Sequence, residues 1–254
     1  MTVKKGRVFS GARPTGRQHL GNYLGAIKNY VALQDEYECI YCIVDLHALT
    51  TLETTKSLKS NTYEMALDWL AAGLRPEETI IFIQSHVPEV TELHTILSMV
   101  VGLGKLTDLP TFKEKARQQP HNINYGLADG VQKMSKSLDK HLELAATPEE
   151  TTARVMTMVT DPQRKRRSDP GDPDVCNVFT MHKIFSTEAD VKEINIECRR
   201  AGIGCVDCKK RFAQNLNAHL APFREKRSGL SENPDQVWNI LVDGAARAGQ
   251  VTAL

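Results

Sequence analysis

Residues 8–22 read VFSGARPTGRQHLGN, and this stretch decides the fold. A short apolar strand at residues 8–10 is followed by a loop with two glycines and a proline, and then by a helix that begins near Gly21. Apolar side chains recur every three or four positions from Leu20 to Val31, which is one face of an amphipathic helix. Because a helix N-terminus presents free backbone N–H groups and a favourable dipole, the sequence predicts a phosphate site between this strand and this helix.

The loop also carries side chains that suit a phosphate ligand. Gly11 and Gly21 leave the backbone open to a ligand. Hydrogen-bond donors follow at Arg13, Thr15, His19 and Asn22. On its own, however, a glycine-rich loop is most often an ordinary strand-to-helix connection.

A second polar segment, KMSKS at residues 133–137, follows Gly130 and is predicted to be a mobile loop. Its two lysines and two serines can hold a polyphosphate and neutralise the negative charge that develops during a reaction. Alone, such a cluster is usually solvated surface, so its meaning depends on the first segment.

Together, these segments resemble the two signatures of class I aminoacyl-tRNA synthetases. HLGN resembles the HIGH-type motif, and KMSKS resembles the KMSKS-type motif. The order and spacing of further motifs resemble bacterial tryptophanyl-tRNA synthetases over nearly the whole chain. These motifs are FSG at 9–11, PTG at 14–16, GNYLGA at 21–26, VDLH at 44–47 and FKEK at 112–115. The resemblance implies activation of tryptophan by ATP to tryptophanyl-adenylate, followed by transfer to tRNA(Trp).

The resemblance also implies roles for single residues. The expected catalytic residues are His19, Lys133 and Lys136. The expected ATP-binding residues are Gly11, Arg13, Pro14, Thr15, Gly21, Asn22, Lys133, Met134, Ser135, Lys136 and Ser137, with Mg²⁺ sharing the phosphate charge. Phe9 and His47 are expected to line the tryptophan pocket, with Lys115 as a further lysine of the site. The family usually has glutamine at the position of Arg13, so the contact there is expected to differ.

The alternation of elements predicts an α/β fold. Apolar runs at 39–45 and 79–84 are typical of buried parallel strands, and helical patterns cover 54–72 and 89–101. Residues 1–146 are therefore predicted to form a Rossmann-like nucleotide-binding domain with a parallel sheet. Residues 147–254 have only helical patterns and are predicted to form a helical domain, which the resemblance makes the tRNA anticodon-binding domain. Its first helix is predicted to start at a capping box formed by Thr147 and Glu150. The apolar stripe of its last helix is predicted to be core, at Val237, Trp238, Ile240 and Leu241.

Only three strand signals are present, and a nucleotide-binding fold of this kind needs a second half. In tryptophanyl-tRNA synthetases a long segment, which includes the aspartate that recognises the indole N–H, intervenes where Leu127 meets Ala128 in this sequence. Either the printed sequence omits an internal segment of the natural protein, or the chain is a genuinely shortened relative. The first is favoured because the flanks match well and an excision would expose apolar surface, although the continuous numbering argues against it.

Six cysteines fall into two groups. Cys39 and Cys42 lie three apart on a predicted strand, point to opposite faces and are expected to be core. The spacing C-x6-C-x2-C, with one more cysteine 22 positions earlier, instead predicts a soft-metal site. Its ligands are Cys176, Cys198, Cys205 and Cys208. A subset of tryptophanyl-tRNA synthetases carries a [4Fe–4S] cluster on a closely similar arrangement, so the cluster is expected, with zinc and unmetallated thiols as alternatives.

Composition sets the remaining limits. The net charge is +1 and no apolar run approaches membrane-spanning length, so a cytoplasmic protein without membrane contact is expected. The basic run RKRR at 164–167 is either a solvated loop or a contact with tRNA phosphates or acidic groups. A homodimer is implied by the resemblance alone. Two other functions remain open: a shortened synthetase paralogue that activates another carboxylate or binds nucleotide or RNA without aminoacylation, and a non-enzymatic RNA-binding or redox module.

Overall fold

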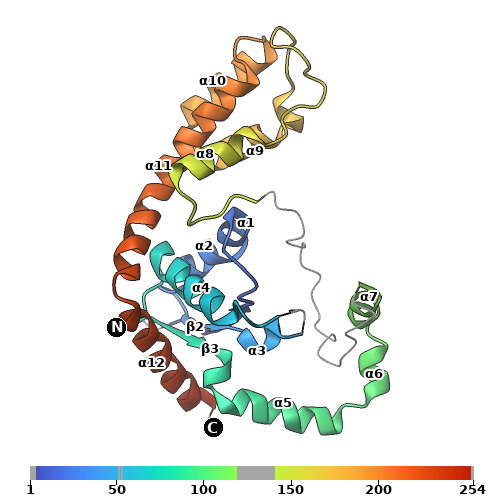
Figure 1. Ribbon diagram of the computed structural model, residues 1–254, viewed down its shortest axis with the longest axis vertical. Helices are drawn as coiled ribbons and strands as arrows, with labels where there is room; N and C mark the ends of the chain where they lie inside the picture. The colour runs from blue at the N-terminus through green and yellow to red at the C-terminus, as the bar shows by residue number, and fades with distance from the viewer. Residues whose placement is uncertain (1–3, 51, 53, 119–140, 253–254) are drawn as a thin grey trace. The chain divides into compact units, whose positions relative to one another are not determined.

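The computed structural model describes residues 4–50, 52, 54–118 and 141–252 (Figure 1). The chain forms two compact units. The first contains residues 1–139 and 227–254, and the second contains residues 140–226. The predicted boundary between functional domains at residues 146 and 147 stays a prediction.

The first unit is built on a parallel sheet in which the order β1-β2-β3 follows the sequence. The strands are β1 (Arg7–Ala12), β2 (Glu38–Ile43) and β3 (Thr79–Ile83). In register, Phe9 pairs with Ile40 and Ile40 with Ile80. Among the described residues β1 pairs only with β2, which agrees with the three strand signals of the sequence.

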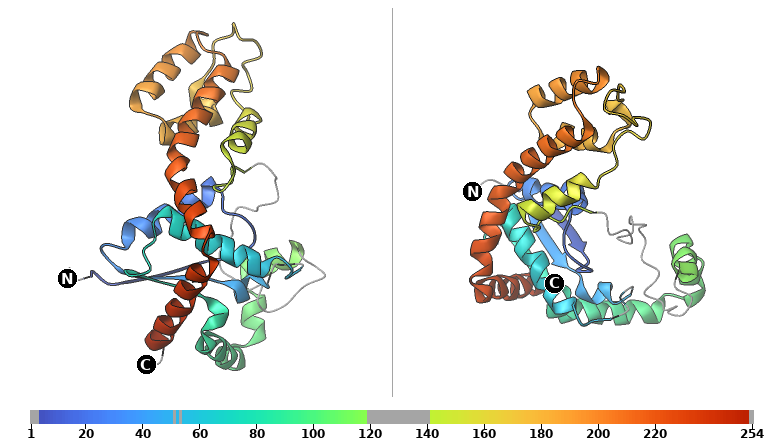
Figure 2. Two further views of the ribbon diagram at one scale, coloured as in Figure 1. Left: turned by 60° about the vertical axis from the view of Figure 1, so that its left-hand side comes forward. Right: turned by 45° about the horizontal axis from the view of Figure 1, so that its top comes forward.

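Helices connect and extend these strands. They are α1 (Leu20–Asn22), η1 (Tyr23–Ile27), α2 (Lys28–Leu33), α3 (Asp45–Ala48), α4 (Leu58–Ala72), η2 (Gln84–His86), α5 (Pro88–Val100), α6 (Leu103–Thr107), α7 (Pro110–Gln118) and α12 (Pro234–Thr252). The predicted first helix is present, but one π-helical turn, η1, interrupts it. Figure 2 shows α5 running outward from the end of β3.

One face of the sheet is covered by aromatic side chains from the crossover helices. Tyr41 of β2 is fully buried and stacks on Tyr30 of α2, with ring centroids 4.1 Å apart. Trp69 of α4 meets the edge of Tyr30 at 5.6 Å. This apolar layer stabilises the sheet because each ring removes a large area from water.

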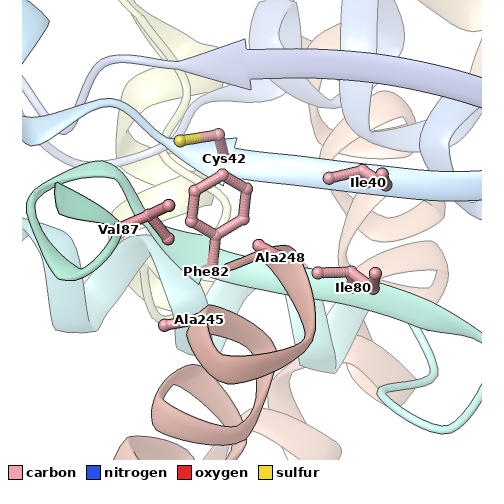
Figure 3. Close-up of a cluster of buried hydrophobic side chains, with 7 residues drawn as sticks. All are labelled: Ile40, Cys42, Ile80, Phe82, Val87, Ala245 and Ala248. Atoms are coloured by element: carbon pink, nitrogen blue, oxygen red, sulfur yellow. The ribbon is translucent and has the colours of Figure 1, made fainter. Parts of the chain in front are cut away.

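The other face is covered by the last helix, α12, at the C-terminal end of the chain. Figure 3 shows Ala245 and Ala248 of α12 against Cys42 of β2 and Ile80 and Phe82 of β3. Cys39 and Cys42 are both buried, as predicted. The apolar stripe of this helix was predicted to be core, and its small residues allow the helix to lie close to the strands.

The second unit is helical. It contains α8 (Pro148–Met156), η4 (Pro173–Val175), α9 (Asn177–Phe185), α10 (Glu188–Arg199) and most of α11 (Cys205–Ser231). The capping box predicted at the start of α8 is confirmed: the Glu150 N–H donates to Thr147 Oγ1 at 3.1 Å, and the Thr147 N–H donates to Glu150 Oε2 at 2.8 Å. No helix in the described part of the chain is long and apolar enough to cross a membrane.

Candidate functional site

The carboxyl ends of the three strands meet at one edge of the sheet. The Val44 N–H, just after β2, donates to the carbonyl of Ala12 at 3.0 Å. The carboxylate of Asp45 accepts from the backbone and the hydroxyl of Ser85, at 3.0 and 2.6 Å. Because open α/β sheets bind ligands at this edge, the candidate site begins here.

His19 forms the N-cap of the first helical run. Its Nδ1 accepts from the backbone N–H of Asn22 at 3.3 Å, and its own N–H donates to Asn22 Oδ1 at 3.1 Å. The two predicted site residues therefore fix each other at the helix N-terminus. This reciprocal cap holds the imidazole in one place beside the free N–H groups of the helix.

Gly21 is needed beside that ring. A Cβ at this position would lie 3.0 Å from both Cε1 and Nδ1 of His19, which is tighter than an ordinary contact. The second glycine of the helical run, Gly25, has no atom within 4 Å of an added Cβ. A side chain at Gly21 of the HLGN motif would therefore crowd His19, whereas a side chain at Gly25 would meet no such contact.

The loop before the helix is held by local backbone geometry. Gly16 has a φ of 140°, a conformation that favours glycine, and the Thr15 N–H donates to the carbonyl of Arg13 at 2.9 Å. Pro14 is buried. At Gly11 a Cβ would lie 2.8 Å from Val44 Cγ1, so this glycine makes room for the side chain of Val44, the residue that follows β2. The loop's shape is thus fixed by contacts within the protein.

The two predicted pocket residues differ in setting. Phe9, in the middle of β1, is 66% exposed. His47, in α3, is half-buried, and its backbone N–H donates to Gln84 Oε1 at 3.0 Å. Gln84 and Ser85, which hold His47 and Asp45, were not predicted from the sequence. The signal that could have found them is their place at the end of a buried parallel strand.

A buried ion pair joins carboxylates of α4 to Arg227 of α11 within the same unit. Asp68 accepts from Arg227 Nε at 2.7 Å, and Glu64 pairs with the same guanidinium. Burial raises the pKa of Asp68 to about 6, although Arg227 and Arg17 oppose this shift. Arg17 belongs to the loop before His19, so this loop acts electrostatically on the carboxylate of Asp68.

Part of the predicted site lies outside the described residues. This part is the KMSKS segment, called the lysine loop below, with the predicted residues Lys133, Met134, Ser135, Lys136 and Ser137. Lys115 lies in α7, and only its backbone is described. The structure describes the predicted residues from Phe9 to Asn22 and His47, and the joint role of all these residues in one site stays a prediction.

The four predicted ligand cysteines come from three helix ends of the second unit. Cys176 caps α9, Cys198 lies in the last turn of α10, and Cys205 and Cys208 begin α11. Burial, and then the thiols of the other three, raises the pKa of Cys208 to about 12. Each thiol is thus an electrostatic neighbour of Cys208.

The surroundings of Cys198 suit an anionic centre. Arg164 Nη1 lies 3.8 Å from Cys198 Sγ, and Arg164 Nε is buried without a hydrogen-bond partner. A Cβ at Gly171 would lie 2.6 Å from Cys198 Sγ, so this glycine leaves space for the sulfur. Within the described ranges, however, no group of three or more His, Cys, Asp or Glu side chains is placed to hold a metal ion. The metal site is therefore not shown.

The turn before Cys205 contains a left-handed residue, Ala201, with a φ of 59°. Gly202 leaves room for Glu197, whose Oε2 would be 1.9 Å from an added Cβ. In the basic run, Arg164 turns inward to the carbonyls of Arg167 and Ile203, both at 2.8 Å.

The family model for class I tRNA synthetases of the tryptophan and tyrosine type matches residues 2–128 and 125–221. This chain belongs to that family. A tryptophan–tRNA ligase of Deinococcus radiodurans is 32% identical, with 97% of this chain and 95% of the relative covered. One of Thermotoga maritima is 33% identical over the same shares. A Campylobacter jejuni tryptophanyl-tRNA synthetase, solved with ADP and tryptophan, superposes with a TM-score of 0.86 at 26% identity and covers 97% of this chain and 96% of that one.

These comparisons also locate the predicted gap. The alignment with the Deinococcus protein has 313 positions and the chain has 254 residues, so at least 59 positions, the difference, have no residue here. The family model matches in two pieces that meet at residues 125–128, where the sequence predicts a missing segment. An internal stretch missing at this point of the printed sequence stays a prediction.

Proposed function

We propose that this chain is a tryptophan–tRNA ligase, which activates tryptophan with ATP and transfers it to tRNA(Trp). The observation that carries the proposal is the similarity to curated tryptophan–tRNA ligases across 97% of the chain. The reciprocal cap between His19 and Asn22 supports it, because it prepares the first motif to receive phosphates.

In the proposed reaction, a carboxylate oxygen of tryptophan attacks the α-phosphorus of ATP and pyrophosphate leaves. A terminal ribose hydroxyl of the tRNA then attacks the activated carbonyl, and AMP leaves. The protein contributes position and charge rather than covalent chemistry. His19, Gly21 and Asn22 hold the nucleotide from one side, together with Gly11, Arg13, Pro14 and Thr15. Lys133, Met134, Ser135, Lys136 and Ser137 close over the pyrophosphate from the other, and Mg²⁺ supplies further positive charge.

The proposal is tested by tryptophan-dependent exchange of pyrophosphate into ATP, followed by aminoacylation of tRNA(Trp). We expect exchange with the full chain and a large loss in Lys136→Ala. Lys192→Ala, which changes an exposed lysine of α10, should exchange normally. Full exchange by Lys136→Ala would refute the role of the lysine loop. Absence of tryptophan-dependent exchange in the unchanged chain would refute the function.

A second candidate is a shortened paralogue that activates another carboxylate, or binds nucleotide or RNA without aminoacylation. The internal gap of at least 59 aligned positions, 313 against 254 residues, favours this candidate. Phe9, His47 and Lys115 are proposed to line the amino-acid pocket, without the residues that the missing segment would supply. Exchange supported by other amino acids but not by tryptophan would select the paralogue.

The partners and assembly are also proposals. We propose that residues 1–146 catalyse activation and that residues 147–254 bind the tRNA anticodon, in a cytoplasmic homodimer. Exposed apolar side chains on α5, which include Ile96 at 59% and Met99 at 78%, support an interface between subunits. The molar mass of the protein in solution, measured by light scattering, tests the dimer. The double variant Ile96→Asp, Met99→Asp should be monomeric if α5 forms the interface.

We further propose a [4Fe–4S] cluster held by Cys176, Cys198, Cys205 and Cys208. The four thiols are close enough for the other three to raise the pKa of Cys208, and the partnerless Arg164 Nε and the space left by Gly171 support an anionic group here. One zinc ion would need thiolates about 3.8 Å apart, from Zn–S bonds of about 2.3 Å in a tetrahedron. A cuboidal cluster holds its thiolates farther apart than one zinc ion does. The separation of the four sulfurs therefore distinguishes the cluster from zinc, which is the alternative.

The cluster is tested by assay of iron and acid-labile sulfide in protein purified without oxygen. Four irons and four sulfides per chain are expected, with a broad visible absorption. Stoichiometric zinc without iron would overturn the cluster and select a zinc site. No metal at all would leave four unmetallated thiols.

A further inference from the structure

A buried histidine contacts one of the four cysteines. His182 of α9 is 0% exposed, and its Nε2 lies 3.3 Å from the carbonyl oxygen of Cys208 and 3.6 Å from its Sγ. Its other ring nitrogen, Nδ1, lies 2.7 Å from Ser186 Oγ. Both nitrogens of the ring are therefore engaged, one of them with a proposed ligand.

The hydrogen bonds behind this ring decide which nitrogen carries the proton. Asn215 Nδ2 lies 3.2 Å from Asp190 Oδ2 and 2.9 Å from Ser186 Oγ. A carboxylate can only accept, so the Asn215 amide donates one hydrogen to Asp190 and its other hydrogen to Ser186. Thr187 Oγ1 donates to the same carboxylate at 2.9 Å, which fixes Asp190 as an acceptor on that side.

Ser186 thus accepts from Asn215 and has its own hydroxyl hydrogen left to donate to His182 Nδ1. The carbonyl oxygen of Cys208 can only accept, so Nε2 carries the ring proton and Nδ1 accepts from Ser186. The Nε2–H then points to the carbonyl and the sulfur of Cys208. A phenyl ring could pack equally well against Phe212, whose centroid is 5.1 Å away, but it could not make this relay.

We propose that His182 is a positioning residue for the four-cysteine centre, with its Nε2–H donated to Cys208 and its tautomer set by Ser186 and Asn215. This inference rests on the proposed cluster. An N–H donor beside a ligand sulfur stabilises the thiolate and orients it, and such outer-shell partners affect both the retention and the reduction potential of a centre.

The test compares the full chain, purified without oxygen, with His182→Phe and Ser186→Ala. Release of iron to a chelator should be about 10-fold faster in His182→Phe, which is the usual scale for loss of an outer-shell partner. The reduction potential should shift to a more negative value, because the lost N–H no longer spreads the added charge. Ser186→Ala, which keeps the buried ring, should shift both quantities in the same direction by less.

Two further variants separate this role from simple packing. His182→Gln keeps an N–H near the former Nε2 and should recover part of the slow iron release. His219→Phe makes the same change at an exposed histidine of α11 that meets the edge of Phe185 at 5.1 Å, and it should leave the iron-release rate and the reduction potential unchanged.

The outcomes distinguish this inference from the cluster itself. If the unchanged chain holds no iron and sulfide, the proposed cluster is wrong and this inference falls with it. If the unchanged chain holds the cluster while His182→Phe and Ser186→Ala match it in release rate and potential, the cluster stands and the positioning role is refuted.

Discussion

At the scale of single residues, the contact between Gly21 and His19 offers a direct test of the first motif. In Gly21→Ala the added Cβ would meet the imidazole at 3.0 Å and push it from its cap position. Because small displacements of reacting groups can cost about 100-fold, we expect pyrophosphate exchange to fall by about 10- to 100-fold. Gly25→Ala, with no atom within 4 Å of its Cβ, should keep its rate. Equal rates in the two variants would contradict the role of the ring.

The raised pKa of Asp68 predicts how the free energy of unfolding depends on pH. Burial raises its pKa to about 6 in the folded chain, so between pH 4 and 6 this carboxyl binds more protons when folded, and its contribution to stability falls as pH rises. The rise in the pKa of Asp68 from 3.8 to about 6 corresponds to about 3 kcal/mol of this contribution. Asp68→Asn should remove this decline, as urea unfolding at several pH values would show. Asp243→Asn, at a side chain 67% exposed, should keep the decline of the unchanged chain.

At the scale of elements, the packing of α12 on β3 depends on one glycine. A Cβ at Gly244 would lie 1.9 Å from the carbonyl oxygen of Ile81, and a backbone atom in a strand cannot move aside. Gly244→Ala should therefore lower the free energy of unfolding by about 1–3 kcal/mol, measured by urea titration. Gly249→Ala, on the same helix but with no atom within 4 Å of its Cβ, should not destabilise the protein. Equal stabilities would mean that α12 does not lie this close to the sheet.

The elements also show what could be predicted from the sequence. The ends of β2 and β3 fall within two residues of the predicted apolar runs, and Thr147 begins α8 as its capping box predicts. The π-helical turn η1 was not predicted, because the apolar spacing from Leu20 to Val31 fits an uninterrupted helix equally well.

For the candidate site, neither the cap nor the pairing across the sheet was predicted, although local sequence could have given the cap. His19 and Asn22 are three residues apart, so their contact can be read from the helix start. Asp45 and Ser85 are forty residues apart, and their contact depends on the parallel order of the strands. The place of α12 could not be predicted either, because an apolar stripe shows that a helix is buried and not which surface covers it.

At the scale of the whole molecule, the internal gap has a consequence for specificity. The family resemblance places the residue that recognises the indole N–H in the absent segment, while the first motif and its cap remain. A site that hydrogen-bonds a polar group of its substrate can discriminate by about 10⁴- to 10⁵-fold, whereas apolar contacts alone give about 10- to 200-fold. We therefore expect ATP binding to be retained and discrimination between tryptophan and tyrosine to be weaker than in a relative without the gap.

The measurement is the ratio of kcat/KM values for tryptophan and tyrosine in pyrophosphate exchange, with the Deinococcus protein as the matched control. Intact mass of the denatured chain is determined first, and a mass well above that of the printed residues would show that the segment is present. With the printed mass, a ratio below that of the control by 100-fold or more is expected. A ratio equal to the control would mean that residues such as Phe9 and His47 suffice to select tryptophan, and that the absent segment does not determine specificity.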